Sequence, residues 1–494
     1  MLQFTHALIR DSLYSSILHA ERRALHGRAA TWFAGRDASL HAEHLARAED
    51  PAAVDAFVAA AQALARDYRL EAALDRIRRA AGIAATASQR CRLAIEEGAL
   101  LLELGTPGAA VEAYDRAIEI APDPHALAAA QLGMAAVLRL IERVDESLPL
   151  LDAAQPALEE AGDHRAMARL EHLRGNLLFP RGRPVECRQA HERALAHARA
   201  CADAELEARA LGGLGDAAYA TGHFTRSRDH FAACIAAARD AGIGRVDVAN
   251  RPMLAIIHAI AGEPDRAMAE ATAAIAAATA ARQPRAEIIA HHIAMMVHLW
   301  CLRPDRVAAH FDRAEALATQ LGARRFKAEN LTFMGEACRL SGDNSRALAL
   351  LGEAVAITRE TGTDYVGAMV LGYQALAAHG RPEIRDPALA EGQALIKPGS
   401  IAHNPIFFGI AAIEAMLLAG LWPRARLYAD GMEAAFAEEP VPLIAFLARR
   451  GRLLADLGER PGDPGLRGEL ADCLAEGRRF GYAAFLQALE AATD

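Results

Sequence analysis

The sequence is poor in aromatic residues and in lysine. Only 5% of its 494 residues are aromatic although 53% are hydrophobic, and lysine occurs only at Lys327 and Lys397. A phosphate-binding loop of the form G-x-x-x-x-G-K-[ST] needs a lysine between a glycine and a hydroxyl residue. Lys327 follows phenylalanine and Lys397 follows isoleucine. The sequence therefore excludes a P-loop ATPase site within these residues.

Cysteine pairs, long apolar runs and a basic stripe are also missing. The seven cysteines are scattered without a C-x-x-C pair, which is typical of reduced thiols in a cytoplasm. No run approaches the ~18 apolar residues of a membrane span. The net charge is −9 with both signs interspersed, whereas nucleic-acid binders usually carry a basic stripe. We therefore expect a cytoplasmic protein that binds neither nucleic acid nor membranes.

Motifs for catalysis and cofactor binding fail on spacing or context. H-E-x-x-H and G-x-S-x-G are absent, which argues against a metalloprotease and an α/β-hydrolase. The G-L-G at 213–215 imitates a dinucleotide-binding fingerprint, but no strand precedes it. His291, Met295 and His298 share a helix face that suits a soft metal; packing of Met295 between helices is the simpler interpretation. We expect no catalytic residues, no cofactor and no metal site.

The clearest positive signal is a turn that recurs at about every fortieth position. Such a period indicates a stack of supersecondary units instead of one closed core, and no β-branched alternation suggests strands. We therefore predict an all-α fold, a right-handed superhelix (α-solenoid) of helix hairpins. The candidate turns lie at Gly105, Glu142, Gly182, Gly222, Gly262, Leu302, Gly342, Gly380, Gly420 and Gly458.

Small residues recur at a fixed distance from these turns. Small side chains at fixed offsets let the two helices of a unit cross at close range, and seven of the ten residues that lie seven positions before the turns are small. The ten are Gly98, Ala135, Gly175, Gly215, Ala255, Met295, Gly335, Tyr373, Ile413 and Gly451.

The opening of the chain does not follow this period. Apolar spacing predicts helices at about 1–20, 21–34, 40–48, 51–67 and 69–81. We therefore divide the chain into a helical adapter, residues 1–86, and a repeat superhelix, residues 87–494. The segment 382–404 is rich in proline and glycine and predicts an irregular unit. Residues after about 460 are expected to form a closing pair of helices.

The repeats resemble tetratricopeptide repeats, in a form that is longer than the common one. The resemblance covers roughly 87–375 well and 376–494 loosely. It implies a superhelix whose inner groove is lined mainly by the first helix of each unit. The match is clearest at Leu211, Leu214, Gly215, Gly222, Phe224, Phe231, Gly335, Gly342, Ala347 and Ala354.

The repeat register projects nine side chains into that groove. Mixed polar and aromatic groups on a concave face suit a protein, a peptide or a small effector; the alternative is a solvated face without a ligand. A second copy of the chain is another candidate partner. The nine are Arg139, His172, Asn176, Arg209, Asp216, Tyr219, His292, Glu336 and Arg339.

The opening FTHALIRDSLYSSILHAERRALHGRAA resembles a segment of STAND-class signalling ATPases, which include MalT-like regulators and proteins fused to adenylate cyclases. In that class the segment ends the nucleotide-binding module and precedes helical repeats. The resemblance implies that His6 senses the β-phosphate of a nucleotide; the alternative is that His6 only packs or caps. The matching residues are Phe4, His6, Ala7, Leu8, Ile9, Arg10, Asp11, Tyr14, Leu18, Arg22, Arg23, Leu25 and His26.

These observations support a non-enzymatic scaffold or sensor arm in bacterial signalling or transcriptional regulation. The alternative is a C-terminal fragment of a STAND regulatory ATPase or of an adenylate or guanylate cyclase whose catalytic module is missing here. A third hypothesis is a purely structural scaffold for oligomerisation.

Overall fold

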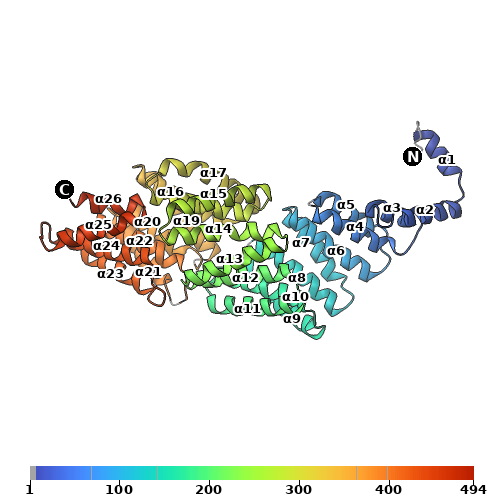
Figure 1. The fold of residues 1–494 in the computed structure, drawn as a ribbon, viewed down its shortest axis with the longest axis horizontal. Coiled ribbons are helices and arrows are strands. Elements are labelled where there is room, and N and C mark those ends of the chain that lie inside the picture. The colour runs from blue at the N-terminus through green and yellow to red at the C-terminus, as the bar shows by residue number, and fades with distance from the viewer. Residues whose placement is uncertain (1–6, 68, 142, 363, 398, 494) are drawn as a thin grey trace. The chain divides into compact units, whose positions relative to one another are not determined.

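The computed structural model describes residues 7–67, 69–141, 143–362, 364–397 and 399–493, and every regular element in those ranges is a helix. Successive helices pair as antiparallel hairpins, and most helix contacts join neighbours in the sequence (Figure 1). This confirms the predicted all-α solenoid. Within the described ranges, no helix is long and apolar enough to cross a membrane.

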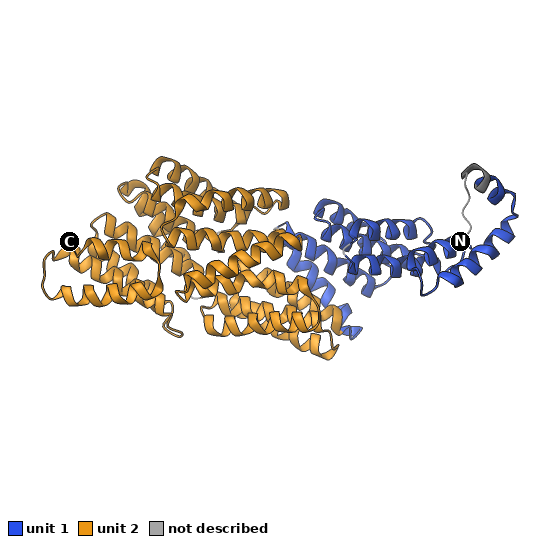
Figure 2. Cartoon of the chain, turned by 45° about the horizontal axis from the view of Figure 1, so that its top comes forward, with its two compact units in different colours: residues 1–163 blue, residues 164–494 orange. Residues whose placement is uncertain are grey.

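The chain forms two compact units, residues 1–163 and residues 164–494 (Figure 2). The predicted boundary at residue 86 falls between two helices of unit 1. Unit 1 contains α1 (Ala7–Ser16), α2 (His19–Phe33), α3 (Ala38–Arg47), α4 (Ala53–Arg66), α5 (Leu70–Ala81), α6 (Ala87–Glu103), α7 (Pro107–Glu119), α8 (Pro124–Leu140) and α9 (Val144–Glu160).

Unit 2 carries the more regular series of hairpins. Its helices are α10 (His164–Leu178), α11 (Pro184–Ala200), α12 (Ala204–Ala220), α13 (Phe224–Asp240), α14 (Gly244–Ile260), α15 (Pro264–Ala280), α16 (Pro284–Trp300), α17 (Val307–Leu321), α18 (Arg324–Leu340), α19 (Asn344–Thr361), α20 (Gly367–Ala377), α21 (Pro382–Leu395), α22 (His403–Leu418), α23 (Trp422–Ala434), α24 (Pro442–Glu459), α25 (Leu466–Phe480) and α26 (Ala483–Ala491), with short 3-10 segments η1 (Phe179–Arg181) and η2 (Pro304–Arg306).

The predicted helix 1–20 is wrong in its extent. The helix α1 ends at Ser16, and the backbone at Leu18 is extended with φ −59° and ψ 145° before α2 begins. The hydroxyls of Ser15 and Ser16 donate to the carbonyls three positions earlier, which competes with continuation of the helix. The other four predicted helices of the opening match α2 to α5 closely, with ends that differ by a few positions.

A backbone residue in the left-handed region recurs at every twentieth position in the regular part of unit 2. Helices α11 to α16 are equal in length and are joined by three connecting residues, so each hairpin spans two such steps. The sequence pattern predicted only every second of these turns. Of the five intervening ones, Ala202 and Arg282 lack glycine, whereas positions 242, 322 and 362 carry it. The left-handed residues are Gly182, Ala202, Gly222, Gly242, Gly262, Arg282, Leu302, Gly322, Gly342 and Gly362.

The small residues before the turns meet large side chains of the next helix. A Cβ atom at Gly215 would lie 2.8 Å from Phe231, and a Cβ at Gly335 would lie 2.8 Å from Leu351. Each partner stands nine positions after its turn. The predicted role of these small residues, close crossing of the two helices in a hairpin, is therefore confirmed at these positions.

One predicted turn in the C-terminal region is wrong, and another predicted turn is not covered. Gly458 lies inside α24, and the turn follows at 460–465; glycine is needed at 458 because a Cβ there would lie 2.6 Å from Trp422. The segment 382–404 is mostly the regular helix α21. Pro382 stands at its first turn, where no backbone N–H has to be satisfied. Residues 396–397 and 399–402, between α21 and α22, are not helical. The predicted turn at Glu142 lies outside the described residues.

The C-terminal part of unit 2 folds back onto the turns of its earlier hairpins. The N–H of Ala402 donates to the carbonyl of Ala220 at 3.0 Å, and the Tyr482 hydroxyl donates to the carbonyl of Ala259 at 2.8 Å. Phe480 covers Gly262 so closely that a Cβ there would lie 2.2 Å from its ring. The stack of hairpins in unit 2 therefore closes on itself.

Candidate functional site

The even-numbered helices of unit 2 form the inner side of the stack. Helix α14 contacts α16, α16 contacts α18, and α18 contacts α20, in addition to their partners within each hairpin. Burial agrees with this arrangement. Helix α16 is buried almost all round, whereas α15 buries only four alanines. The first helix of each hairpin therefore lines the inner side.

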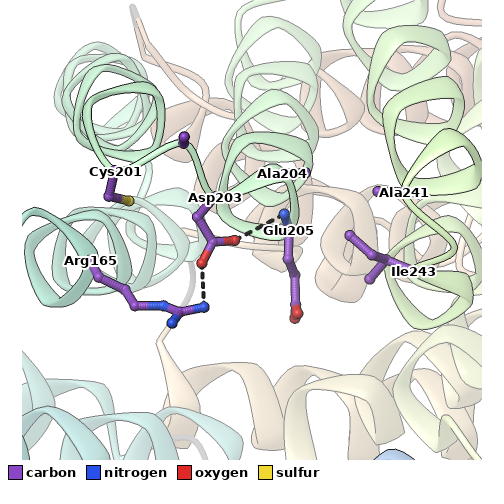
Figure 3. A pocket seen from close by; sticks show the side chains of 8 residues that line it. Arg165, Cys201, Asp203, Ala204, Glu205, Ala241 and Ile243 are labelled. Atoms are coloured by element: carbon purple, nitrogen blue, oxygen red, sulfur yellow. Dashed lines mark hydrogen bonds and ion pairs between the residues drawn. The ribbon is translucent and has the colours of Figure 1, made fainter.

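An open pocket of about 460 Å³ lies at one end of the inner helices (Figure 3). Asp203 caps the start of α12, because its carboxylate accepts from the N–H groups of Glu205 and Leu206 at 3.0 and 3.1 Å. Arg165 of α10 reaches the same carboxylate at 2.6 Å. Burial opposes ionisation of Asp203, but the hydrogen bonds and Arg165 outweigh it, so the pKa of Asp203 is lowered. The ion pair between Arg165 and Asp203 therefore lies at the rim of the pocket.

Four of the predicted groove residues are exposed or half-buried on α10 and α12. Arg209 is exposed and pairs with Glu205 at 2.6 Å, and Asp216 is half-buried. Asn176 donates to the ring of His172 at 2.9 Å, one helical turn away. These side chains combine both charges with neutral donors and acceptors.

Of the remaining predicted residues of unit 2, Tyr219, His292 and Glu336 are buried and Arg339 is half-buried. Tyr219 is 2% exposed and lies against Phe224 and His403. The guanidinium of Arg339 binds both carboxylate oxygens of Glu336 at 2.7 and 2.8 Å. Arg339 and Glu336 therefore bind each other within α18. The structure thus separates exposed Arg209 from buried Tyr219, His292 and Glu336.

Two predicted residues do not join that arrangement. Arg139 is half-buried on α8 of unit 1. His6 lies outside the described residues, as does Phe4 of the same motif. The predicted roles of Arg139 and His6 stay predictions.

A buried polar cluster that the sequence reasoning missed surrounds His292. The Nδ1 atom of His292 pairs with the carboxylate of Glu329, and its Nε2 lies 2.6 Å from Oδ1 of Asn330. The amide nitrogen of Asn330 donates to Glu315 at 3.0 Å. Glu329 and Asn330 stand between Ala328 and Leu331. That signal, two adjacent polar residues between apolar ones on the first helix of a hairpin, would have pointed to the cluster.

The other sequence motifs have structural roles. Met295 is fully buried at its packing position. The Nδ1 atoms of His291 and His310 are 2.8 Å apart, and the His298 ring lies 5.5 Å from that of His310. Within the described ranges, no group of three or more His, Cys, Asp or Glu side chains is arranged to hold a metal ion.

The G-L-G motif at 213–215 serves helix packing. Gly213 and Gly175 enclose the ring of His191, because a Cβ would lie 2.2 Å from it at Gly213 and 2.4 Å from it at Gly175. His191 is fully buried, and neither ring nitrogen has a hydrogen-bond partner among the described residues. Burial lowers the pKa of His191 to about 3, so this imidazole is neutral.

Comparison with known proteins agrees with the repeat geometry. Residues 166–240 match the sequence model of the tetratricopeptide repeat. No curated protein matches the chain. Among solved structures, the fold is similar to a Rap protein complexed with Competence and Sporulation Factor, with a TM-score of 0.50 and 13% identity over 74% of this chain and 97% of that chain.

Two further structures are less similar. One is a STAND protein with a tetratricopeptide repeat sensor from Pyrococcus horikoshii, with a TM-score of 0.42 and 16% identity over 64% of this chain and 51% of that chain. The other is aspartyl phosphate phosphatase F from Bacillus subtilis, with a TM-score of 0.40 and 10% identity over 76% of this chain and 95% of that chain. The family match and the geometry together show that this chain carries tetratricopeptide repeats within an α-solenoid.

Proposed function

We propose that this chain is a non-enzymatic tetratricopeptide scaffold that binds a protein or peptide partner on the inner side of unit 2. The observation that carries the proposal is the set of accessible polar side chains on the inner helices, next to the open pocket at the start of α12. Arg209 and Asp216 present opposite charges there. Polar groups on a concave helical surface suit an extended partner.

The test compares inner and outer surfaces of one hairpin. Arg209→Ala with Asp216→Ala removes both charges from α12. Arg228→Ala with Asp229→Ala removes the same two residue types from α13, where both side chains are exposed. Proteins captured from the native cell by wild type and by the α13 variant, but lost at least fivefold by the α12 variant, would support the proposal. Equal capture by both variants would contradict it.

The finer proposal places this scaffold in cytoplasmic bacterial signalling, as the arm of a STAND-type regulator. It rests on the N-terminal resemblance, and one structural observation supports it. Large apolar side chains in that segment or just after it are exposed, with Leu13 51%, Leu18 73% and Trp32 58% accessible. Exposed apolar side chains that gather on a surface often mark interaction sites, and we propose that a nucleotide-binding module covers these three.

Nucleotide binding tests the signalling proposal. A STAND-type nucleotide-binding module is added to the full chain, and its affinity for ATP and ADP is measured by calorimetry. We expect His6→Ala to weaken nucleotide binding at least fivefold, because the family's histidine contacts the β-phosphate. His19→Ala, at an exposed histidine of α2, serves as the control. Unchanged affinity in the His6→Ala variant would remove the sensing role.

A further inference from the structure

A second cavity lies deeper on the inner side of unit 2, where four inner helices converge. It has a volume of about 70 Å³ and is bounded by α16, α18, α20 with the two residues before it, and α22. One water-sized group needs about 10–15 Å³ measured in this way. The cavity therefore has room for about five such groups, which suits one aliphatic side chain and an adjoining main-chain atom.

Most of the cavity wall is apolar. All but one of its apolar side chains are 5% exposed or less, so they are held by packing from behind. This wall suits an aliphatic group because it offers no hydrogen bonds to a polar one. The apolar wall residues are Ile289, which is half-buried, and Ile293, Met296, Phe333, Val366, Met369 and Phe407.

One end of the cavity is polar, and hydrogen bonds fix the positions of its side chains. Asn330 directs its amide nitrogen to Glu315, so its Oδ1 faces His292. The other ring nitrogen of His292 faces a carboxylate oxygen of Glu329. Both ring nitrogens of His292 therefore face oxygen atoms, and the ring holds Glu329 and Asn330 at this end of the cavity.

Glu329 offers a second carboxylate oxygen beside the one that contacts His292. Its Oε2 atom pairs with His292, and its Oε1 atom can accept a further hydrogen bond. The side chain retains 11% of its accessible surface, and the residue lines the cavity. Burial opposes ionisation of Glu329, but His292 and the more distant His403 and Arg325 outweigh it, so its pKa is lowered. A carboxylate oxygen accepts and cannot donate.

We propose that this cavity is an anchor pocket for one aliphatic side chain of a partner peptide, with a main-chain N–H of that peptide donating to Oε1 of Glu329. This inference rests on the proposed function and names the chemistry that the partner must present. An acidic side chain is excluded by the Glu329 carboxylate. A basic side chain meets the guanidinium of Arg325, which lies 4.5 Å from the centre of the Tyr365 ring.

The experiment uses the full chain and capped amino acids as probes. Dissociation constants of N-acetyl-leucinamide, N-acetyl-aspartamide and N-acetyl-lysinamide are measured by ligand-observed NMR. We expect the leucine probe to bind at least tenfold more tightly than either charged probe. Val366→Phe directs a ring into the cavity and should abolish that preference. Leu427→Phe, at a side chain of α23 that is 67% exposed, should keep it.

A second variant covers the case in which Val366→Phe does not fold, as judged by circular dichroism. Glu329→Gln keeps the shape of the side chain but replaces a carboxylate oxygen, and we expect it to weaken the leucine probe at least fivefold. Equal binding of the three probes to wild type, or unchanged leucine binding in both pocket variants, would overturn the proposal. The α12 charge variant tests the proposed function separately, because it should lose partner capture yet keep N-acetyl-leucinamide binding.

Discussion

His191 is buried on the second helix of its hairpin. Other hairpins have a larger or a more apolar side chain at the equivalent position. In equivalent places after other turns, Tyr114, Phe231 and Leu351 pack against a glycine of the preceding helix. His191 has the shape for the same packing but adds two ring nitrogens that no described residue satisfies. An unsatisfied buried polar group costs about 1–3 kcal/mol. At this position a single residue makes stability depend on pH.

We predict that stability declines below pH 6.5 partly through His191. Its pKa is about 3 in the folded chain and about 6.5 when unfolded. Since the unfolded state binds the proton more readily, stability is complete above pH 6.5. It is lost as pH falls from 6.5 toward 3, by about 1.4 kcal/mol for each pH unit.

The variant His191→Leu should remove this contribution. Urea unfolding at pH 7.0 and 5.0 should show a smaller loss of stability than in wild type, by about 2 kcal/mol between the two pH values. His291, His298 and His403 also have lowered pKa values, so the variant keeps part of the slope. His125→Leu, at an exposed histidine, should leave the slope as in wild type. A slope equal to that of wild type in the His191→Leu variant would contradict the prediction.

Among the elements, the hairpin turns depend on one left-handed residue each. Glycine adopts this conformation without steric cost, whereas other L-residues are destabilised by about 1–2 kcal/mol. Ala202, Arg282 and Leu302 nevertheless occupy it, with φ of 51°, 51° and 54°. The packed helices on either side impose the turn, so the local preference of these residues is overridden.

We predict that Arg282→Gly stabilises unit 2 by about 0.5–1 kcal/mol, because it relieves the left-handed strain at a modest entropic cost. Arg282 is exposed, so little packing is lost. The matched control is Ala281→Gly, one position earlier, where φ is −82°; there glycine should destabilise by up to about 1 kcal/mol. Thermal unfolding of both variants measures the difference, and a lower melting temperature for Arg282→Gly would refute this account.

At the level of the whole chain, unit 2 is held closed by its own C-terminal helices. Phe480, Gly481 and Tyr482 pack on the turn between α14 and α15, which lies far earlier in the sequence. Trp300 lies 5.2 Å from the ring of Tyr482 and joins the same core. Contacts of such long range tie the ends of the hairpin stack together, unlike an open solenoid in which each repeat touches only its neighbours.

A comparison of two turn glycines measures how much this closure contributes to stability. Gly262 and Gly342 have φ of 82° and 87° in the same repeat register, so alanine is equally strained at both. A Cβ at Gly262 would also lie 2.2 Å from Phe480, whereas nothing lies within 4 Å at Gly342. We therefore predict that Gly262→Ala destabilises the chain by about 1–3 kcal/mol more than Gly342→Ala.

Hydrogen exchange shows where that difference acts. In the Gly262→Ala variant, amides of α25 and α26 should exchange at least tenfold faster than in wild type, because Phe480 is displaced. The Gly342→Ala variant should leave those amides unchanged. Equal exchange of α25 and α26 in the two variants would mean that the C-terminal helices do not depend on this contact.

The sequence by itself determined the class of fold, because the turn glycines at 222, 262 and 342 and the small residues at 215 and 335 are local requirements of a helix hairpin. It predicted only every second turn, and at two of the missed turns Ala202 and Arg282 adopt a conformation that their own preference does not indicate. It also placed the inner helices correctly but could not separate exposed Arg209 from buried Tyr219.

Tertiary structure decided what the inner side offers to a ligand. The closure by residues 400–490 buries Tyr219, and the joining of His292 with Glu329 depends on how α16 packs against α18. Neither follows from a repeat register, because a register fixes the direction of a side chain relative to its own helix and carries no information about which distant helix will cover it. The period is a local property of the sequence, whereas the pocket exists only where four helices meet.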